Sequence, residues 1–410
     1  METTLDKIIN DFNGNVVTEM NYLLAHRLPV PKKKIDKWNF TTALCSQVAI
    51  ENLLQLYERQ LQRVPVSREA QASLEEETWK PCPGGEYQGH KHGAHRDGYG
   101  SCKYTNGDRY DGEWKDDKRH GLGVQTYSNG NKYEGDWDND YCHGYGIYIR
   151  DAGGRGDSYR GQWDKGVKQG WGRYDWANKD VYEGEWDNNK PRGYCRFTWA
   201  TPHQTYEGEW DVDHQQGHGT MRYENSNVYD GEWVNGRRHG KGTFTYATHD
   251  TTYDSDSEMQ GSEKKPETIE HDIYTGEWVN DKQKGKCEFK WATGHTYKGD
   301  WEGEHPEGEG EFKYASGDTY SGEWKNGKRD GRGTATYVDG SRYTGSWLND
   351  LRHGDLGTFT SKDGDTWQCP WKDDHEEGAG ILIKKNGHRS NEVWQHGERQ
   401  TLLMKILGHY

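Results

Sequence analysis

Tyr110-Asp111-Gly112-Glu113-Trp114 returns 23 residues later as Tyr133-Glu134-Gly135-Asp136-Trp137. A fixed period of this kind along most of a chain indicates a repeat architecture. Seven of the eleven intervals between successive copies are 23 residues, and the others are 26, 24, 45 and 24. The copies begin at Tyr87, Tyr110, Tyr133, Tyr159, Tyr182, Tyr206, Tyr229, Tyr274, Tyr297, Tyr320, Tyr343 and Trp367. The repeat therefore decides the fold, and insertions fall between copies or at their ends.

The composition of the 410-residue chain favours an aromatic core over an aliphatic one. Hydrophobic residues make up only 30%, while the chain holds 54 Gly, 27 Tyr and 19 Trp. Low aliphatic content with high charge is typical of disorder, but disordered chains are poor in aromatic residues. The net charge of −15 argues against nucleic acid as a partner, because such surfaces need clustered Lys and Arg. We expect a folded array that binds no nucleic acid.

The cysteines and the N-terminus predict a cytoplasmic protein. Seven Cys occur with no Cys-x-x-Cys pair, and Cys195, Cys287 and Cys369 stand where other copies carry Gly. An odd number of Cys without metal-ligand spacing is typical of reduced thiols. Met1 is followed by acidic and polar residues, and we find no apolar run that resembles a signal sequence or a membrane span.

Residues 1–84 differ from the repeats and predict a helical N-terminal extension followed by a linker at 65–83. Residues 41–61 carry apolar side chains at helical spacing. Two interpretations remain open: a helical unit packed on the first repeat, or a docking or dimerising helix for another protein. The candidate docking residues are Leu44, Val48, Leu54, Tyr57 and Leu61.

The array itself is expected over residues 85–390. It is interrupted by a long acidic insertion at 247–273, which we expect to be a flexible surface loop because it is polar and nearly free of aliphatic residues. Residues 391–410 end in an apolar run and are expected to cap the last open edge.

Each copy predicts a pair of antiparallel strands. Tyr, Gly and Trp at positions 1, 3 and 5 alternate with polar residues, so they share one face of a strand. Positions 12, 14 and 18 share a parity in the same way, and Asp116 to Arg119 form a polar turn between the two runs. Gly130 provides the positive φ of the next turn. We expect the strand glycines to leave room for an aromatic ring from the adjoining strand, and the opposite face, with Asp111 and Glu113, to be solvated.

No arrangement in the sequence predicts catalysis, a metal site or a cofactor. His120, His143, His239 and His353 precede glycines in four copies, but only two of these copies are adjacent, and a metal site needs three or four converging ligands. We interpret them as solvated turn residues. No Ser/His/Asp or Cys/His arrangement stands out from the repeat, and no second globular domain fits outside it. The chain is therefore not expected to be an enzyme.

At its repeat residues the chain resembles the MORN (membrane occupation and recognition nexus) repeat family, whose pattern is Tyr-x-Gly-x-Trp followed by Gly-x-Gly and a second aromatic residue. Tyr229 to Trp233 with Gly240, Gly242 and Tyr246 matches this pattern, as does Tyr320 to Trp324 with Gly331, Gly333 and Tyr337. The resemblance implies a mainly β fold, an elongated single-layer twisted antiparallel sheet of about twelve stacked hairpins.

The resemblance also implies a function. Long MORN arrays with few other domains are similar to axonemal radial-spoke-head proteins and other cytoskeletal adaptors, which implies a non-catalytic scaffold in a cilium or flagellum, a large protein assembly as partner, and a homodimer as one state. The alternative is a membrane-tethering protein that binds phospholipid such as phosphoinositide. The residues expected to form the repeat face, as structural groups or as a partner groove, are Tyr110, Gly112, Trp114, Tyr133, Trp137, Tyr159, Trp163, Tyr182, Trp186, Tyr206, Trp210, Tyr229, Trp233, Tyr274, Trp278, Tyr297, Trp301, Tyr320, Trp324, Tyr343 and Trp347.

Overall fold

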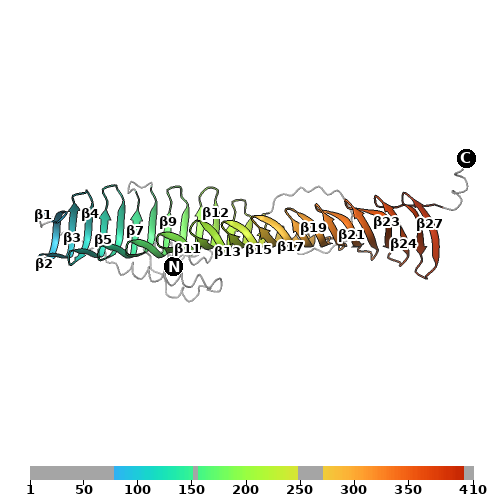
Figure 1. Ribbon diagram of the computed structural model, residues 1–410, viewed down its shortest axis with the longest axis horizontal. Helices are drawn as coiled ribbons and strands as arrows, with labels where there is room; N and C mark the ends of the chain where they lie inside the picture. Colours follow the sequence, from blue (N-terminus) through green and yellow to red (C-terminus); the bar gives the residue numbers. More distant parts are fainter. Residues whose placement is uncertain (1–77, 151–155, 248–270, 401–410) are drawn as a thin grey trace, which may run out of the picture. The chain divides into compact units, whose positions relative to one another are not determined.

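The computed structural model describes residues 78–150, 156–247 and 271–400, which fall into two compact units divided in the sequence after His214. In the described residues of both units the only regular elements are β-strands, 28 in all (Figure 1). The strand pairings are antiparallel and, with one exception near the C-terminal end, join strands that are consecutive in the chain. The chain is therefore mainly β, as predicted. The predicted N-terminal helix, with Leu44 to Leu61, lies outside the described residues, and so do most of the insertion and the last ten residues.

The first unit contains twelve strands. They are β1 (Lys80–Cys82), β2 (Gly85–His92), β3 (His95–Tyr104), β4 (Arg109–Lys115), β5 (Lys118–Thr126), β6 (Lys132–Asp138), β7 (Tyr141–Ile149), β8 (Ser158–Asp164), β9 (Val167–Asp175), β10 (Val181–Asp187), β11 (Lys190–Trp199) and β12 (Gln204–Asp211). Strand β1 lies inside the segment predicted to be a linker, where it pairs Lys80 with Tyr87 of β2. The sheet thus begins before the first copy of the repeat.

The second unit contains the remaining strands, starting with β13 at the boundary between the units. They are β13 (His214–Arg222), β14 (Val228–Val234), β15 (Arg237–Thr245), β16 (Ile273–Val279), β17 (Lys282–Lys290), β18 (Thr296–Glu302), β19 (His305–Lys313), β20 (Thr319–Lys325), β21 (Lys328–Thr336), β22 (Arg342–Leu348), β23 (Leu351–Thr360), β24 (Thr366–Lys372), β25 (His375–Glu376), β26 (Gly378–Ile383), β27 (Arg389–Gln395) and β28 (Glu398–Arg399). Strand β26 pairs with β24 and passes over the short β25. Pairing continues to Arg399, beyond the predicted end of the array at residue 390.

Each copy forms the predicted hairpin. In the second copy, β4 and β5 pair Arg109 with Thr126 and Gly112 with Gly123. The turn between them places Asp116 and Asp117 at φ angles of 49° and 67°, which is the left-handed pair of a type I′ turn that matches the twist of a hairpin. The connection to the next copy turns at Gly130, with a φ of 88°.

A β-bulge in every regular hairpin changes one prediction. The register of β4 against β5 shifts after Gly112, where Gly121 and Leu122 have no partner on β4. In this bulge Gly121 takes a positive φ, and positions 12 and 14 of the copy do not face the same side. A side chain at Gly121 would meet Glu113 on the outer face, whereas one at Gly123 would overlap the Tyr110 ring on the inner face. Gly121 has a φ of 58°, and the Glu113 carboxylate accepts a hydrogen bond from the Leu122 N–H at 3.2 Å. The glutamate therefore satisfies a backbone donor that the bulge removes from the ladder.

The core of each unit is one layer of rings on one face of the sheet. The tyrosines that begin copies 2 to 11 have no solvent exposure, and Tyr87 of the first copy is 1% exposed. No second sheet or helix covers a face among the described residues. Stability must therefore come mainly from contacts between neighbouring copies, as in other repeat proteins.

Candidate functional site

The tyrosine of each copy crosses the glycines of its own hairpin. The Tyr110 hydroxyl donates a hydrogen bond to the Glu113 carbonyl at 2.9 Å, and the ring lies over Gly112 and Gly123. A side chain at either glycine would overlap the ring, which explains why glycine stands in the middle of a strand. Burial raises the pKa of the Tyr110 hydroxyl far above its usual value, so this group stays neutral.

The tryptophan joins its own copy to the preceding one. The Trp137 ring makes edge-to-face contacts with Tyr110 at 5.4 Å and with Tyr133 at 5.1 Å between ring centres. Its Nε1–H donates to the carbonyl of Gly123, a residue of the preceding copy, at 3.2 Å. Perpendicular ring pairs of this kind add to the free energy gained by burial alone.

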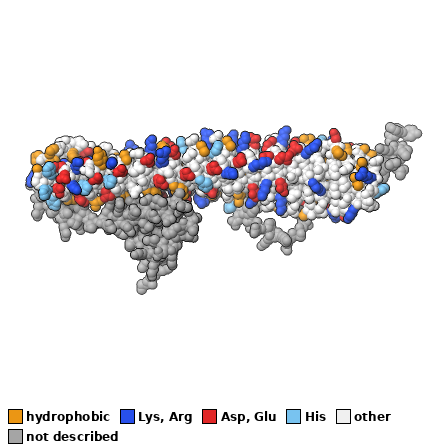
Figure 2. Space-filling view, turned by 60° about the horizontal axis from the view of Figure 1, so that its bottom comes forward, with side chains coloured by type: hydrophobic (Ala, Val, Ile, Leu, Met, Phe, Trp, Pro, Cys, Tyr) orange, Lys and Arg blue, Asp and Glu red, His pale blue; other side chains and the backbone are white. Residues whose placement is uncertain are grey.

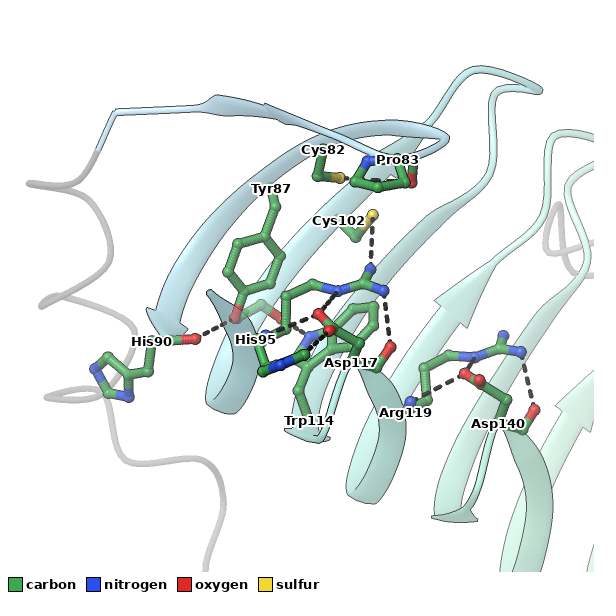
Figure 3. A network of polar contacts seen from close by, with 12 residues as sticks. Cys82, Pro83, Tyr87, His90, His95, Cys102, Trp114, Asp117, Arg119 and Asp140 are labelled. Atoms are coloured by element: carbon green, nitrogen blue, oxygen red, sulfur yellow. Dashed lines mark hydrogen bonds and ion pairs between the residues drawn. The ribbon is translucent and has the colours of Figure 1, made fainter. Parts of the chain in front are cut away.

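An arginine covers five of the repeat tryptophans at the turn edge of the sheet. The guanidinium carbon of Arg119 lies 4.2 Å from the centre of the Trp137 ring. Its Nε and its backbone N–H donate to the Asp140 carboxylate at 3.1 and 2.9 Å, and Nη2 donates to the Asp140 carbonyl at 2.9 Å (Figure 3). Because three donors of one residue bind one turn, the side chain is held over the indole.

The same arginine–aspartate clamp occurs five times in the described part of the chain. The distance from guanidinium carbon to tryptophan ring centre ranges from 4.0 to 4.5 Å. The pairs are Arg96–Asp117, Arg119–Asp140, Arg238–Asp281, Arg329–Asp350 and Arg352–Asp374. The backbone N–H of Arg96 and the His95 ring lower the pKa of Asp117 to about 2, so this carboxylate is charged at neutral pH.

The clamps were not predicted, although the sequence contains their signal. Arginine stands at position 10 of these copies and aspartate at position 8 of the copy that follows. In the fourth copy Lys168 takes the arginine position and Asn189 the aspartate position. The Lys168 ammonium lies 4.7 Å from the Trp186 ring centre, and its backbone N–H donates to Asn189 at 2.9 Å. Burial lowers the pKa of Lys168 to about 8.

Two copies depart from this ring geometry where cysteine replaces glycine at position 14. Next to Cys195, the Trp210 Nε1–H donates to the carbonyl of Val212, and the ring stacks on Phe197 with 5.2 Å between centres and 7° between planes. Next to Cys287, Trp301 stacks in the same way on Phe289, at 5.3 Å and 8°. In both copies the cysteine side chain stands where the regular copies have none, and the tryptophan ring lies nearly parallel to the phenylalanine two residues after the cysteine.

The expected repeat-face residues lie in these layers, below the molecular surface. From Trp114 to Trp347 the expected tryptophans are 3–8% exposed, and the expected tyrosines have no exposure. No ring at these positions is accessible enough for a partner to stack on. A partner must instead contact the outward side chains or the edges of a unit.

The histidines singled out by the sequence lie at the turns. His120 pairs with Asp138 and His143 with Asp164, both at 3.3 Å from Nδ1 to carboxylate. Within the described ranges no three His, Cys, Asp or Glu side chains converge on one point as metal ligands would. In the same ranges there is also no helix with the length and apolar character needed to cross a membrane.

Comparison with solved structures gives only distant similarity. The TCP domain of Drosophila melanogaster SAS-4 (dCPAP), solved with a proline-rich motif of Ana2, is 13% identical, with 50% of this chain and 85% of that chain covered and a TM-score of 0.23. A mutant TCP10 domain of Danio rerio CPAP is 10% identical, with 65% and 96% covered and a TM-score of 0.21. A streptogramin B lyase is 10% identical, with 72% and 90% covered and a TM-score of 0.13. No curated protein matches the chain.

The repeat itself matches a known family model. The family model for the MORN repeat matches eleven segments, at residues 87–109, 110–132, 133–155, 159–181, 182–201, 206–228, 229–251, 274–296, 297–319, 320–342 and 343–366. Together these segments make up more than half of the chain. With a hairpin, a buried tyrosine and a joining tryptophan in each regular copy, the chain belongs to the MORN repeat family.

Proposed function

We propose that this protein is a non-catalytic scaffold that holds other proteins of a large cytoskeletal assembly, in the axoneme of a cilium or flagellum. One observation carries the proposal: the buried frame is nearly the same in every copy, while the outward residues differ. Position 13, for example, is Leu122 in the second copy and Lys241 in the seventh. A constant frame with variable outward side chains is what a surface for several different protein partners requires.

The outer face of the second unit supports protein over lipid as the partner. A shallow groove of about 490 Å³ runs over β13 to β17. Lys241 and Lys286 line it together with Asp230 and Glu277. Figure 2 likewise shows basic and acidic side chains interspersed along the described surface. An anionic membrane attracts clustered basic residues, so mixed charge favours the complementary surface of a protein.

The proposal is tested in ciliated cells that express the tagged full-length protein. We expect co-localisation with axonemal tubulin, retention in axonemes after detergent extraction, and release together with defined proteins at high salt. A protein that stays in the detergent-soluble fraction would refute the axonemal setting.

The membrane-tether alternative is tested separately with the purified full-length chain. We expect no flotation with vesicles that contain phosphatidylserine and phosphatidylinositol bisphosphate. Flotation that is lost at high salt would identify a lipid-bound tether in place of a protein scaffold.

A further inference from the structure

A row of large apolar residues crosses the outer face of the first unit, where the sequence predicted a solvated surface. We call it the outer row. It occupies position 13 of five successive copies and consists of Tyr99, Leu122, Tyr145, Trp171 and Tyr194. In the second unit, the same position holds Lys241, Lys286, Glu309 and Arg332 in copies 7 to 10. The fold accepts charged residues at this position, so the apolar ones are not needed to build the hairpin.

The strand register places the outer row on the face opposite the tyrosine layer. Leu122 precedes Gly123, whose missing side chain would point at the Tyr110 ring, so Leu122 points the other way. Trp171 lies opposite Glu185 of β10, which has the same outward position as Glu113 of β4. The row therefore runs across β3, β5, β7, β9 and β11 on the outside of the sheet.

The outer row is shielded from solvent to a degree that the sheet does not explain. Trp171 is 9% exposed, and the other four residues are half-buried. The four equivalent residues of the second unit are all exposed. Among the described residues no helix or second sheet lies over this face. A single antiparallel layer leaves its outer side chains in water unless something packs on them.

We propose that the outer row is the docking surface for residues 41–61 of the same chain, which bind it as an amphipathic helix. That segment has the matching chemistry, because Leu44, Val48, Leu54, Tyr57 and Leu61 recur at helical spacing. An apolar helix face laid on an apolar sheet face buries both from water, which is the usual way in which two layers form a core.

The dimensions of the two elements agree. A helix over residues 41–61 would be roughly 30 Å long. The outer row spans eight strand spacings, or roughly 38 Å. Residues 62–77 connect the segment to Thr78 and to β1, which lies two strands from Tyr99, and a connection of this length can reach about 50 Å when extended. The segment can therefore reach every copy that contributes to the row.

The test uses the full-length chain and a triple variant, Leu122→Lys, Tyr145→Lys and Trp171→Lys. Lysine is the natural residue at this position in the seventh and eighth copies, so the hairpins should still fold. The matched control replaces the equivalent residues of the second unit, as Lys241→Ala, Lys286→Ala and Arg332→Ala. Hydrogen–deuterium exchange of the amides in residues 41–61 is the measurement, and far-ultraviolet circular dichroism checks the sheet.

We expect amides of residues 41–61 to be protected in the wild type and in the control. In the triple variant each substitution should lower the docking equilibrium constant by about tenfold, since the buried area of a large apolar side chain is worth at least this factor. Free exchange of the segment in the wild type, or unchanged protection in the triple variant, would overturn the proposal.

A second variant, Leu54→Glu with Leu61→Glu, leaves every described residue unchanged. Hydroxyl-radical labelling of Tyr145 and Trp171 should then rise several-fold relative to the wild type, and unchanged labelling would also overturn the proposal. Measurements at different protein concentrations distinguish docking within one chain from docking by a second copy. Docking in the same chain gives protection that is independent of dilution, whereas protection that falls on dilution, with a dimer in light scattering, would assign the surface to a second copy.

Discussion

The Arg119 guanidinium lies over the Trp137 ring, 4.2 Å from guanidinium carbon to ring centre, and Asp140 fixes it there with both its carboxylate and its carbonyl. The three residues belong to two successive copies, so the clamp binds one hairpin to the next. It also covers the face of an indole that a single-layer sheet would otherwise leave open to water at the turns.

Removing the guanidinium should weaken the first unit measurably. We expect Arg119→Ala to lower the free energy of unfolding by about 1–2 kcal/mol, from lost packing over the indole and lost hydrogen bonds to a partly exposed aspartate. The control is Arg109→Ala, whose side chain is 48% exposed, forms an ion pair with Asp111 and lies 6.0 Å from the centre of the Trp79 ring, and it should cost no more than about 0.5 kcal/mol. Urea unfolding followed by tryptophan fluorescence measures both. Equal losses would show that the clamp has no special role.

The space above the strand glycines can be tested by adding one methyl group. We expect Gly123→Ala to destabilise the protein by about 1–3 kcal/mol, because the added carbon overlaps the Tyr110 ring, which is held on both sides. Cys195→Ala, at the same position three copies later, should cost about 1 kcal/mol or less, since the native structure already holds a buried side chain there and only the sulfur is removed. Thermal unfolding of both variants gives the comparison, and a smaller loss for Gly123→Ala would contradict the steric explanation.

The buried tyrosines predict unfolding in alkali. Burial raises the pKa of Tyr104, Tyr127 and Tyr174 to about 12, and those of the fully buried tyrosines further. In the unfolded chain the same groups ionise near pH 10. Above that pH the unfolded state has fewer bound protons than the folded state, so stability falls as pH rises. Tyrosinate absorbance and loss of the β signal should therefore appear together. Gradual ionisation near pH 10 with the sheet intact would contradict this.

The lowered pKa of Lys168 predicts that its contribution to stability rises with pH, in a pH range below that of the tyrosines. Its pKa is lowered to about 8 by burial in the folded protein, whereas the unfolded value is about 10.5. Between these values the unfolded chain binds more protons at this group, so its contribution to stability rises with pH. We expect the unfolding free energy of the wild type to rise relative to that of Lys168→Met as the pH is raised from roughly 7 to roughly 9.5. A difference that is independent of pH would show that Lys168 is solvated.

The eleventh copy contains one residue too many, and removing it should stabilise the second unit. The register of β23 against β24 shifts between Gly354 and Gly357, Leu356 is 67% exposed, and Trp371 Nε1–H has no acceptor among the described residues. Deletion of Leu356 restores the regular spacing, so the Trp371 Nε1–H should gain a carbonyl acceptor. We expect the free energy of unfolding to rise by about 1 kcal/mol. Deletion of Arg332, which likewise precedes the second glycine of a regular copy, is the control and should destabilise. A lower free energy of unfolding in both deletions would show that β23 requires its extra residue.

The hairpins and the tyrosine–glycine contact could be predicted because they depend only on alternation and on the size of one residue. Tyr110, Gly112 and Trp114 share a face in any straight strand, and glycine opposite a large ring has one simple steric explanation. The direction of Gly121 was predicted wrongly, because a bulge reverses the faces and its presence depends on the pairing partner. Nothing in the alternation of a single strand reveals that Gly121 and Leu122 have no partner on β4.

The features that were missed arise from relations between copies. Arg119 and Asp140 are 21 residues apart, and their contact becomes evident only when successive copies are laid side by side. The outer row was missed for a similar reason. Leu122 and Trp171 are each ordinary apolar residues in a strand, and they form a row only because every second strand brings the same position to the same face.

The long insertion leaves the frame around it unchanged. The Tyr246 N–H donates to the Asp272 carbonyl at 2.9 Å, the same bond that Tyr127 makes to Asn131 in an uninterrupted copy, and Arg238 still reaches Asp281. The turn that follows the second strand of a copy is thus closed by its two ends, whatever length of chain lies between them. For protein engineering this makes the turn a suitable insertion site. A fluorescent reporter or a binding peptide could be inserted there without disturbing the hairpins on either side.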